Sequence, residues 1–157
     1  MPKKIPLLIF SIAVCLGAGV VGSFFTISAI PTWYATLHKP IFSPPNWVFG
    51  PVWTLLYILM GIALYKIVTS RKSQESSRAI RLFIIQLILN TLWSIIFFGL
   101  HNPVLAFVDI VALWITIVLT MQAFYKINKV AGNLLIPYIL WVSFATILNV
   151  AIVILNP

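Results

Sequence analysis

The chain has 157 residues, of which 62% are hydrophobic and only 8% are charged. A water-soluble domain carries about 25% charged residues, so this composition excludes a soluble globular fold and indicates a surface that faces lipid. The formal net charge of +8 could suit nucleic acid, but the basic residues cluster between apolar runs, which argues against that partner and is typical of a membrane protein. The single cysteine, Cys15, excludes an internal disulfide framework.

Five apolar stretches are long enough to cross a bilayer as helices, which takes roughly 20 residues each. They cover about residues 5–27, 47–68, 79–100, 104–126 and 133–155. Helices are favoured because isolated strands would leave backbone groups without partners in lipid. The sequence therefore predicts an all-α integral membrane protein, in which residues 1–157 form a single bundle of five transmembrane helices.

The first stretch follows two lysines, as a signal peptide would, but its apolar run exceeds the ~7–15 residues of a signal core. We therefore expect a retained helix. Small residues recur along it at four-residue spacing, at Ser11, Cys15, Gly19 and Ser23. Such a stripe lets two helices approach closely. Packing inside the monomer is the favoured interpretation, and a homodimer, with a second copy of the chain as partner, is the alternative.

The segment 28–46 between the first two stretches is neither short nor solvating. It contains prolines at positions 31, 40, 44 and 45, together with Trp33, Tyr34 and Phe42. Prolines and large aromatic side chains indicate an ordered segment rather than a flexible linker. We expect this first loop to cap the helix bundle.

The basic residues predict the orientation of the chain in the membrane. Nine of the ten lysines and arginines lie on one side: at the N-terminus, in the second and fourth loops, or at the ends of the stretches that flank those loops. The opposite side holds only Lys39. The positive-inside rule places the N-terminus in the cytoplasm and the C-terminus outside. A bacterial plasma membrane is the expected location.

Polar groups and aromatic rings share one face of the second, third and fifth predicted helices, at three- and four-residue spacing. These faces hold Trp53 and Tyr57, then Gln86, Asn90 and Trp93, then Tyr138, Trp141, Ala145 and Asn149. Polar groups avoid lipid, so the faces should point inward. They predict either a pocket for a large, flat, mostly apolar ligand or ordinary hydrogen bonds between packed helices.

Few residues could carry acid–base or metal chemistry. Asp109 is the one acid inside a predicted span, which makes it a functional candidate, although it could simply accept hydrogen bonds from a neighbouring helix. His38 and His101 fall in loops, where a solvated histidine is favoured over a haem ligand. The sequence contains no metal-ligand cluster and no known enzyme motif.

Several motifs together carry a family resemblance that covers nearly the whole chain. They are Trp33-Tyr34, Leu37, Lys39-Pro40, Pro44-Pro45, the run WVFGPVW at 47–53, Leu56-Tyr57, the run NTLW at 90–93, Phe97-Phe98-Gly99, Pro137-Tyr138, Trp141, Ala145-Thr146 and Leu148-Asn149. With these motifs the chain resembles the TspO/MBR family of tryptophan-rich sensory proteins and mitochondrial benzodiazepine receptors.

The resemblance implies a five-helix bundle whose ligand pocket is closed by the first loop. It implies binding of porphyrins such as protoporphyrin or haem-like tetrapyrroles, and in some members sterols or benzodiazepine-site drugs. The ligand-binding residues that it implies are Tyr34, Pro44, Trp53, Tyr57, Asn90, Trp93, Tyr138, Trp141, Ala145 and Asn149, with Asp109 matching an acid of some bacterial relatives.

The resemblance leaves the class of activity open. Some bacterial members promote light- and oxygen-dependent porphyrin degradation, for which Trp53 and Trp141 would be the redox partners of a bound porphyrin. No separate cofactor is then required, because the porphyrin is itself ligand or substrate. The alternative is a non-catalytic transporter or sensor of tetrapyrroles or sterol-like ligands that regulates stress responses.

Three departures from the family pattern are visible. Phe42 stands where the family often has tryptophan, the sterol-recognition pattern expected after the fifth helix is missing from residues 150–157, and the third helix has no small-residue stripe for a dimer interface.

Overall fold

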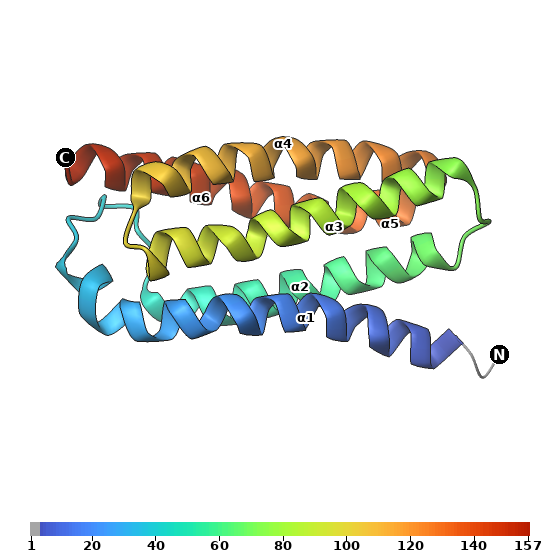
Figure 1. The fold of residues 1–157 in the computed structure, drawn as a ribbon, viewed down its shortest axis with the longest axis horizontal. Coiled ribbons are helices and arrows are strands. Elements are labelled where there is room, and N and C mark those ends of the chain that lie inside the picture. Colours follow the sequence, from blue (N-terminus) through green and yellow to red (C-terminus); the bar gives the residue numbers. More distant parts are fainter. Residues whose placement is uncertain (1–3) are drawn as a thin grey trace.

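The structure, a computed structural model, describes residues 4–157 and consists of long helices that lie side by side (Figure 1). In chain order the elements are α1 (Lys4–Ala29), the π-helical turn η1 (Ile30–Tyr34), α2 (Asn46–Val68), α3 (Gln74–Ser94), the π-helical turn η2 (Ile95–Gly99), α4 (Pro103–Ile127), α5 (Lys129–Leu134) and α6 (Ile136–Leu155). Residues 4–157 contain no strand. Five helical segments are long and apolar enough to cross a membrane, which confirms the predicted fold class.

The first helix runs further than the sequence predicts. It continues from α1 into η1, so the segment without helix begins after residue 36 instead of at residue 28. Pro31 lies at the start of η1 and has no backbone N–H to continue an α-helical ladder. The chain accommodates it by widening into a π-turn, and the non-helical part of the first loop shortens to residues 37–45.

The third helix begins earlier than predicted, at Gln74 instead of residue 79. Ser73 caps it: the Ser73 hydroxyl accepts from the Ser76 N–H at 3.1 Å, and the Ser76 hydroxyl accepts from the Ser73 N–H at 2.9 Å. A reciprocal cap of this kind satisfies the first donors of a helix. The polar residues 74–78, which look like loop when only hydropathy is considered, are therefore the first turn of α3.

The last membrane span consists of two pieces. α5 ends at Leu134 and α6 starts at Ile136, with Pro137 in the first turn of α6. Proline removes the N–H that would bond to the carbonyl of Asn133, four residues earlier. The helix is interrupted at residue 135, a junction that we call the elbow between α5 and α6, and a single predicted span over 133–155 does not contain this interruption.

The bundle has two chemically different ends. The end that we call the basic end holds the start of α1, the α2–α3 turn and the α4–α5 turn, where all the described lysines and arginines except Lys39 lie. The opposite end, which we call the capped end, holds η1, the first loop, the α3–α4 turn and the C-terminus (Figure 1). The first loop is tied down at this end, because Asn156 accepts from the His38 N–H and donates to the His38 carbonyl, both at 2.9 Å.

In the half of the bundle next to the basic end, α1 and α2 meet at their backbones. A Cβ on Gly61 of α2 would lie 2.5 Å from the Cα of Ile12, so these two helices touch at their backbones. Phe83 of α3 stacks on Phe124 of α4 with ring centres 5.6 Å apart, and both are fully buried. Ser11 and Cys15 of the α1 stripe are buried too, so this part of the stripe is used for packing inside the monomer.

Candidate functional site: a cavity in the capped half

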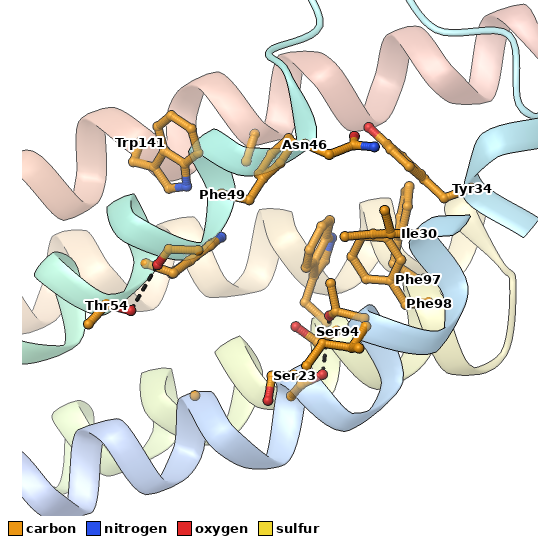
Figure 2. A pocket seen from close by; sticks show the side chains of 18 of the residues that line it. Ser23, Ile30, Tyr34, Asn46, Phe49, Thr54, Ser94, Phe97, Phe98 and Trp141 are labelled. Atoms are coloured by element: carbon orange, nitrogen blue, oxygen red, sulfur yellow. Dashed lines mark hydrogen bonds between the residues drawn. The ribbon is translucent and has the colours of Figure 1, made fainter. Parts of the chain in front are cut away.

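A cavity of about 470 Å³ lies in the half of the bundle next to the capped end. Figure 2 shows side chains from α1, η1, α2, α3, η2 and α6 arranged around this one space. Its lining combines aromatic rings with a few hydroxyls and amides: Tyr34, Trp47, Phe49, Trp53, Tyr57, Trp93, Phe97, Phe98 and Trp141, with Ser23, Thr26, Asn46, Thr54, Ser94 and Asn149. A mostly apolar wall with few polar groups is typical of a small-molecule site.

Both π-helical turns border the cavity. η1 contributes Ile30 and Tyr34, and η2 contributes Phe97 and Phe98. In η2 the Leu100 N–H donates to the Ile95 carbonyl at 2.9 Å, five residues back, which gives each turn one extra residue. π-turns inside helices are frequently found at functional sites. Here the two turns bring aromatic side chains together on one wall of the cavity. The rings of Tyr34 from η1 and Phe98 from η2 lie with their centres 5.6 Å apart.

Trp53 lies on the α2 wall of the cavity with its ring held from two sides. It stacks on Tyr57, one turn further along α2, with ring centres 5.7 Å apart. Tyr138 of α6 meets it edge-on at 6.4 Å. Such aromatic pairs fix ring orientation, so the indole face that lines the cavity is preorganised.

A chain of buried hydrogen bonds closes the bottom of the cavity. The Tyr57 hydroxyl donates to Asn90 Oδ1 at 2.5 Å, Asn90 Nδ2 donates to the Tyr138 hydroxyl at 2.8 Å, and that hydroxyl donates to Gln86 Oε1 at 2.7 Å. The chain ends where Gln86 Nε2 faces Met60 Sδ at 3.9 Å. It links α2, α3 and α6, and every member is buried. In lipid such polar groups find partners only within the protein, so this network fixes the three helices relative to one another.

A second interhelical set holds the opposite wall. Trp93 Nε1 donates to Asn149 Oδ1 at 3.0 Å, and Asn149 Nδ2 donates to the Pro103 carbonyl at 2.9 Å. Trp93 also stacks on Phe97 with ring centres 5.0 Å apart. Trp93 and Asn149 both line the cavity, but their polar atoms already have partners.

Trp141 differs from the other indoles of the cavity. Its ring lies beside Phe49 and Phe144, at 6.0 and 5.6 Å between ring centres. Its Nε1 is buried and has no hydrogen-bond partner. A buried donor without a partner is costly, and Trp141 lines the cavity (Figure 2). The Trp141 ring therefore carries a buried N–H that no protein group satisfies, at the wall of the cavity.

The cavity reaches the surface between α1 and α2. Of its lining residues, Ile27 on α1 is 70% exposed and Trp47 on α2 is 75% exposed. Within the described chain no residue of the non-helical loop, 37–45, lines the cavity. A ligand can therefore enter the cavity from the lipid side, between α1 and α2. The first loop closes the capped end of the bundle.

The structure brings most of the sequence-predicted residues together and leaves some apart. Seven line the cavity: Tyr34, Trp53, Tyr57, Trp93, Trp141, Ala145 and Asn149. Asn90 and Tyr138 lie behind the wall in the buried network. Pro44 and Asp109 do not line the cavity. Asp109 is buried on α4, and its Oδ2 has no hydrogen-bond partner. Whether any of these residues binds a ligand stays a prediction.

Sequence reasoning missed the α1 wall of the cavity. Gly19, Ser23 and Ile30 line it together with Ser94 and Phe97 of the third span. The small-residue stripe of α1 was the available signal, but it predicts close packing only. Within residues 4–157 no group of three or more histidine, cysteine, aspartate or glutamate side chains is placed to hold a metal ion.

Comparison with known proteins matches this chain over its length. A family model described as the TspO/MBR family matches residues 11–155. The "Tryptophan-rich protein TspO" of Chlorobaculum tepidum is 50% identical over 158 residues, covering 100% of both chains. A protein of the same name from Archaeoglobus fulgidus is 51% identical over 95% of this chain and 96% of its own. The human "Translocator protein" is 38% identical over 94% of this chain and 88% of its own.

Proposed function

This chain belongs to the TspO/MBR family of membrane proteins, and on that premise we propose that its cavity binds a porphyrin or a similar flat tetrapyrrole. The relatives carry names that describe a tryptophan-rich protein and a translocator, which fits a receptor for a small molecule in the membrane. The identity of that molecule is our proposal.

The observation that carries the proposal is the aromatic wall with one unused donor. The cavity of about 470 Å³ falls in the usual range for small-molecule sites, roughly 300–1,000 Å³. Flat rings stack favourably on indole faces, and Trp53 and Trp141 offer such faces from α2 and α6. The free Trp141 Nε1 suits the carboxylate that a protoporphyrin carries at its edge.

Quenching of tryptophan fluorescence by added protoporphyrin tests this proposal with the full chain in detergent. We expect saturable quenching in the native sequence and at least roughly tenfold weaker binding in Trp53→Ala and in Trp141→Ala, since a stacked anchor contributes more than 1.4 kcal/mol. Trp114→Phe is the control, because Trp114 does not line the cavity. Its indole N–H instead donates to the Ser143 hydroxyl at 2.8 Å. Equal affinity in all four proteins would remove the cavity as the site.

Two activities follow from a bound porphyrin, and light separates them. In the first, the photo-excited ring takes one electron from the Trp53 or Trp141 indole and passes it to dioxygen from solution, and the oxidised indole then recovers an electron from the porphyrin. Dioxygen is thereby reduced and the porphyrin is oxidised. In the second, the protein only binds, carries or senses its ligand. Illumination of the complex in air, followed by absorption spectroscopy, distinguishes them: a new spectral species that disappears in Trp53→Phe or Trp141→Phe supports degradation. Bleaching at the rate of free porphyrin supports binding alone.

The proposed orientation places the capped end outside the cell and the basic end in the cytoplasm of a bacterial plasma membrane. It rests on the nine-to-one distribution of basic residues. Ile41 in the first loop and Gln74 at the start of α3 are both exposed. In a Cys15→Ala background, an impermeant thiol reagent should label Ile41→Cys in intact cells and miss Gln74→Cys. The opposite labelling pattern would reverse the orientation without affecting the cavity.

A further inference from the structure

A second hollow lies at the basic end, on the elbow between α4, α5 and α6, far along the bundle from the aromatic cavity. It has a volume of about 420 Å³ and is lined by the last turns of α4, by α5 and by the first residue of α6. Figure 1 shows α5 at the same end of the bundle as the α2–α3 turn. The hollow therefore lies where the helices leave the hydrocarbon core.

The side chains around this hollow divide into a polar and an apolar part. Lys126, Gln122 and Asn133 supply an ammonium group and two amides, whereas Met121 and Ile136 supply apolar surface. Within residues 4–157, none of these three polar side chains makes a hydrogen bond to the protein, although most hydroxyls and amides of the bundle do. All three side chains are exposed beside the hollow, so their donors are free to bind a group that enters it.

The floor of the hollow is held by close packing. A Cβ on Gly132 of α5 would lie 2.9 Å from the Cα of Tyr125 and 2.8 Å from its ring, so α5 packs closely on the end of α4. Pro137, in the first turn of α6, interrupts the helix beside the hollow. The shape of the hollow is therefore determined by the packing of Gly132 and by the break at Pro137, and it does not depend on the exposed Lys126 side chain.

The charge around the hollow selects its occupant. At this end of the described chain, Lys126 has seven further cations, Lys4, Lys66, Arg71, Lys72, Arg78, Arg81 and Lys129, against the single acid Glu75. Basic pockets between transmembrane helices on the cytoplasmic side of a membrane, where the proposed orientation puts this end, bind anionic lipid headgroups. The apolar residues continue the pocket towards the hydrocarbon, as an acyl chain requires.

We propose that the elbow hollow is a binding site for one anionic phospholipid. Lys126 contacts the phosphate, the amides of Gln122 and Asn133 donate hydrogen bonds to its oxygens, and an acyl chain lies along Met121 and Ile136. A zwitterionic lipid offers the same phosphate but places its own cation beside Lys126, so it binds more weakly.

Native mass spectrometry of the full chain in detergent tests this site, with dioleoyl phosphatidylglycerol and dioleoyl phosphatidylcholine as probes. We expect one phosphatidylglycerol to be retained more tightly than phosphatidylcholine. Lys126→Gln should weaken its binding roughly fivefold. Lys129→Gln is the matched control: it removes the same charge three residues further along, outside the hollow, and should change binding by less than about twofold.

One more variant and a competition experiment complete the test. Asn133→Leu leaves the net charge unchanged and should also weaken phosphatidylglycerol binding, which tests the site even if Lys126→Gln fails to fold. Equal losses in Lys126→Gln and Lys129→Gln would reduce the effect to general electrostatic attraction and overturn the site. Full displacement of the lipid by millimolar inorganic phosphate would show an anion site that needs no lipid, which also contradicts the proposal.

Discussion

Next to the basic end, α1 and α2 touch at their backbones, whereas next to the capped end the same two helices border a cavity. The contact of Gly61 with Ile12 marks the first region, and the aromatic wall around Trp53 marks the second. Small residues remove the space between helices, and large rings that lean on one another keep it open. We call the half next to the basic end the base and the half next to the capped end the hollow top. One bundle can therefore combine a tightly packed base with a hollow top without any change of topology.

The buried hydrogen-bond network separates the two regions. Tyr57 belongs to both, since its ring lines the cavity and its hydroxyl bonds to Asn90. Below it, Met60 and Ala63 are fully buried in the tight core. The comparison predicts that substitutions in the base act on stability, and that substitutions in the hollow act on ligand binding.

The largest effect is expected at Gly61. Gly61→Ala places a methyl group 2.5 Å from the Ile12 Cα, and because the obstacle is backbone, α1 and α2 must move apart. We expect a loss of about 2–3 kcal/mol in the free energy of unfolding, measured by denaturation in detergent. Gly17→Ala is the control, because nothing lies within 4 Å of its added Cβ. Equal stability of the two variants would break the distinction between a tight base and a hollow top.

Asn90→Leu tests the boundary between the regions. It removes two interhelical hydrogen bonds and leaves the Tyr57 hydroxyl without its acceptor. We expect a loss of about 1–2 kcal/mol together with weaker porphyrin binding, because Tyr57 is then free to turn in the cavity wall. A destabilised protein that binds porphyrin with its original affinity would show that the network belongs to the base alone.

A pair of tryptophan substitutions tests the hollow itself. Trp93→Phe loses the bond to Asn149 and should lower stability by about 1 kcal/mol. Trp141→Phe removes a buried N–H that has no partner, so the unliganded protein should change by less than about 0.5 kcal/mol. Thermal unfolding of both variants without ligand makes the comparison. A larger loss in Trp141→Phe than in Trp93→Phe would mean that the Trp141 N–H is satisfied in the membrane.

The smallest effect is expected at the clamp on the first loop. Asn156→Ala removes both hydrogen bonds to the His38 backbone, so the capped end should open more often. Ligand association and dissociation should both quicken by roughly threefold to fivefold, with little change in affinity. Stopped-flow fluorescence measures both rates. Asn156→Asp keeps the acceptor for the His38 N–H and should show a smaller change, and identical rates in all three proteins would remove the loop from gating.

The sequence was sufficient for the five spans and for the inward direction of the aromatic and polar faces. Composition excludes a soluble fold, and the spacing of Gln86, Asn90 and Trp93 places them on one helix face. Gln86 and Asn90 are in fact buried. These features are local, because hydropathy and helical periodicity act within about 20 residues.

The features that depend on packing between distant segments could not be predicted from the sequence. Which group Asn90 bonds to is decided by Tyr57 and Tyr138, which lie 33 and 48 residues away. The contribution of α1 to the cavity and the position of Asp109 outside it follow from the rotation of whole helices. The extension of α1 into η1 was missed for a different reason: Pro31 is usually a helix breaker, and here it widens the helix instead.

The wall contributed by α6 and the clamp at Asn156 have a consequence for how the protein is made. Trp141, Ala145 and Asn149 belong to the last helix in chain order, and Asn156 follows that helix. During synthesis α1 to α4 reach the bilayer first, and at that stage the site lacks one wall and its latch. The cavity is therefore complete only when α6 has been inserted, so a chain that stalls on the ribosome before this step has no finished cavity.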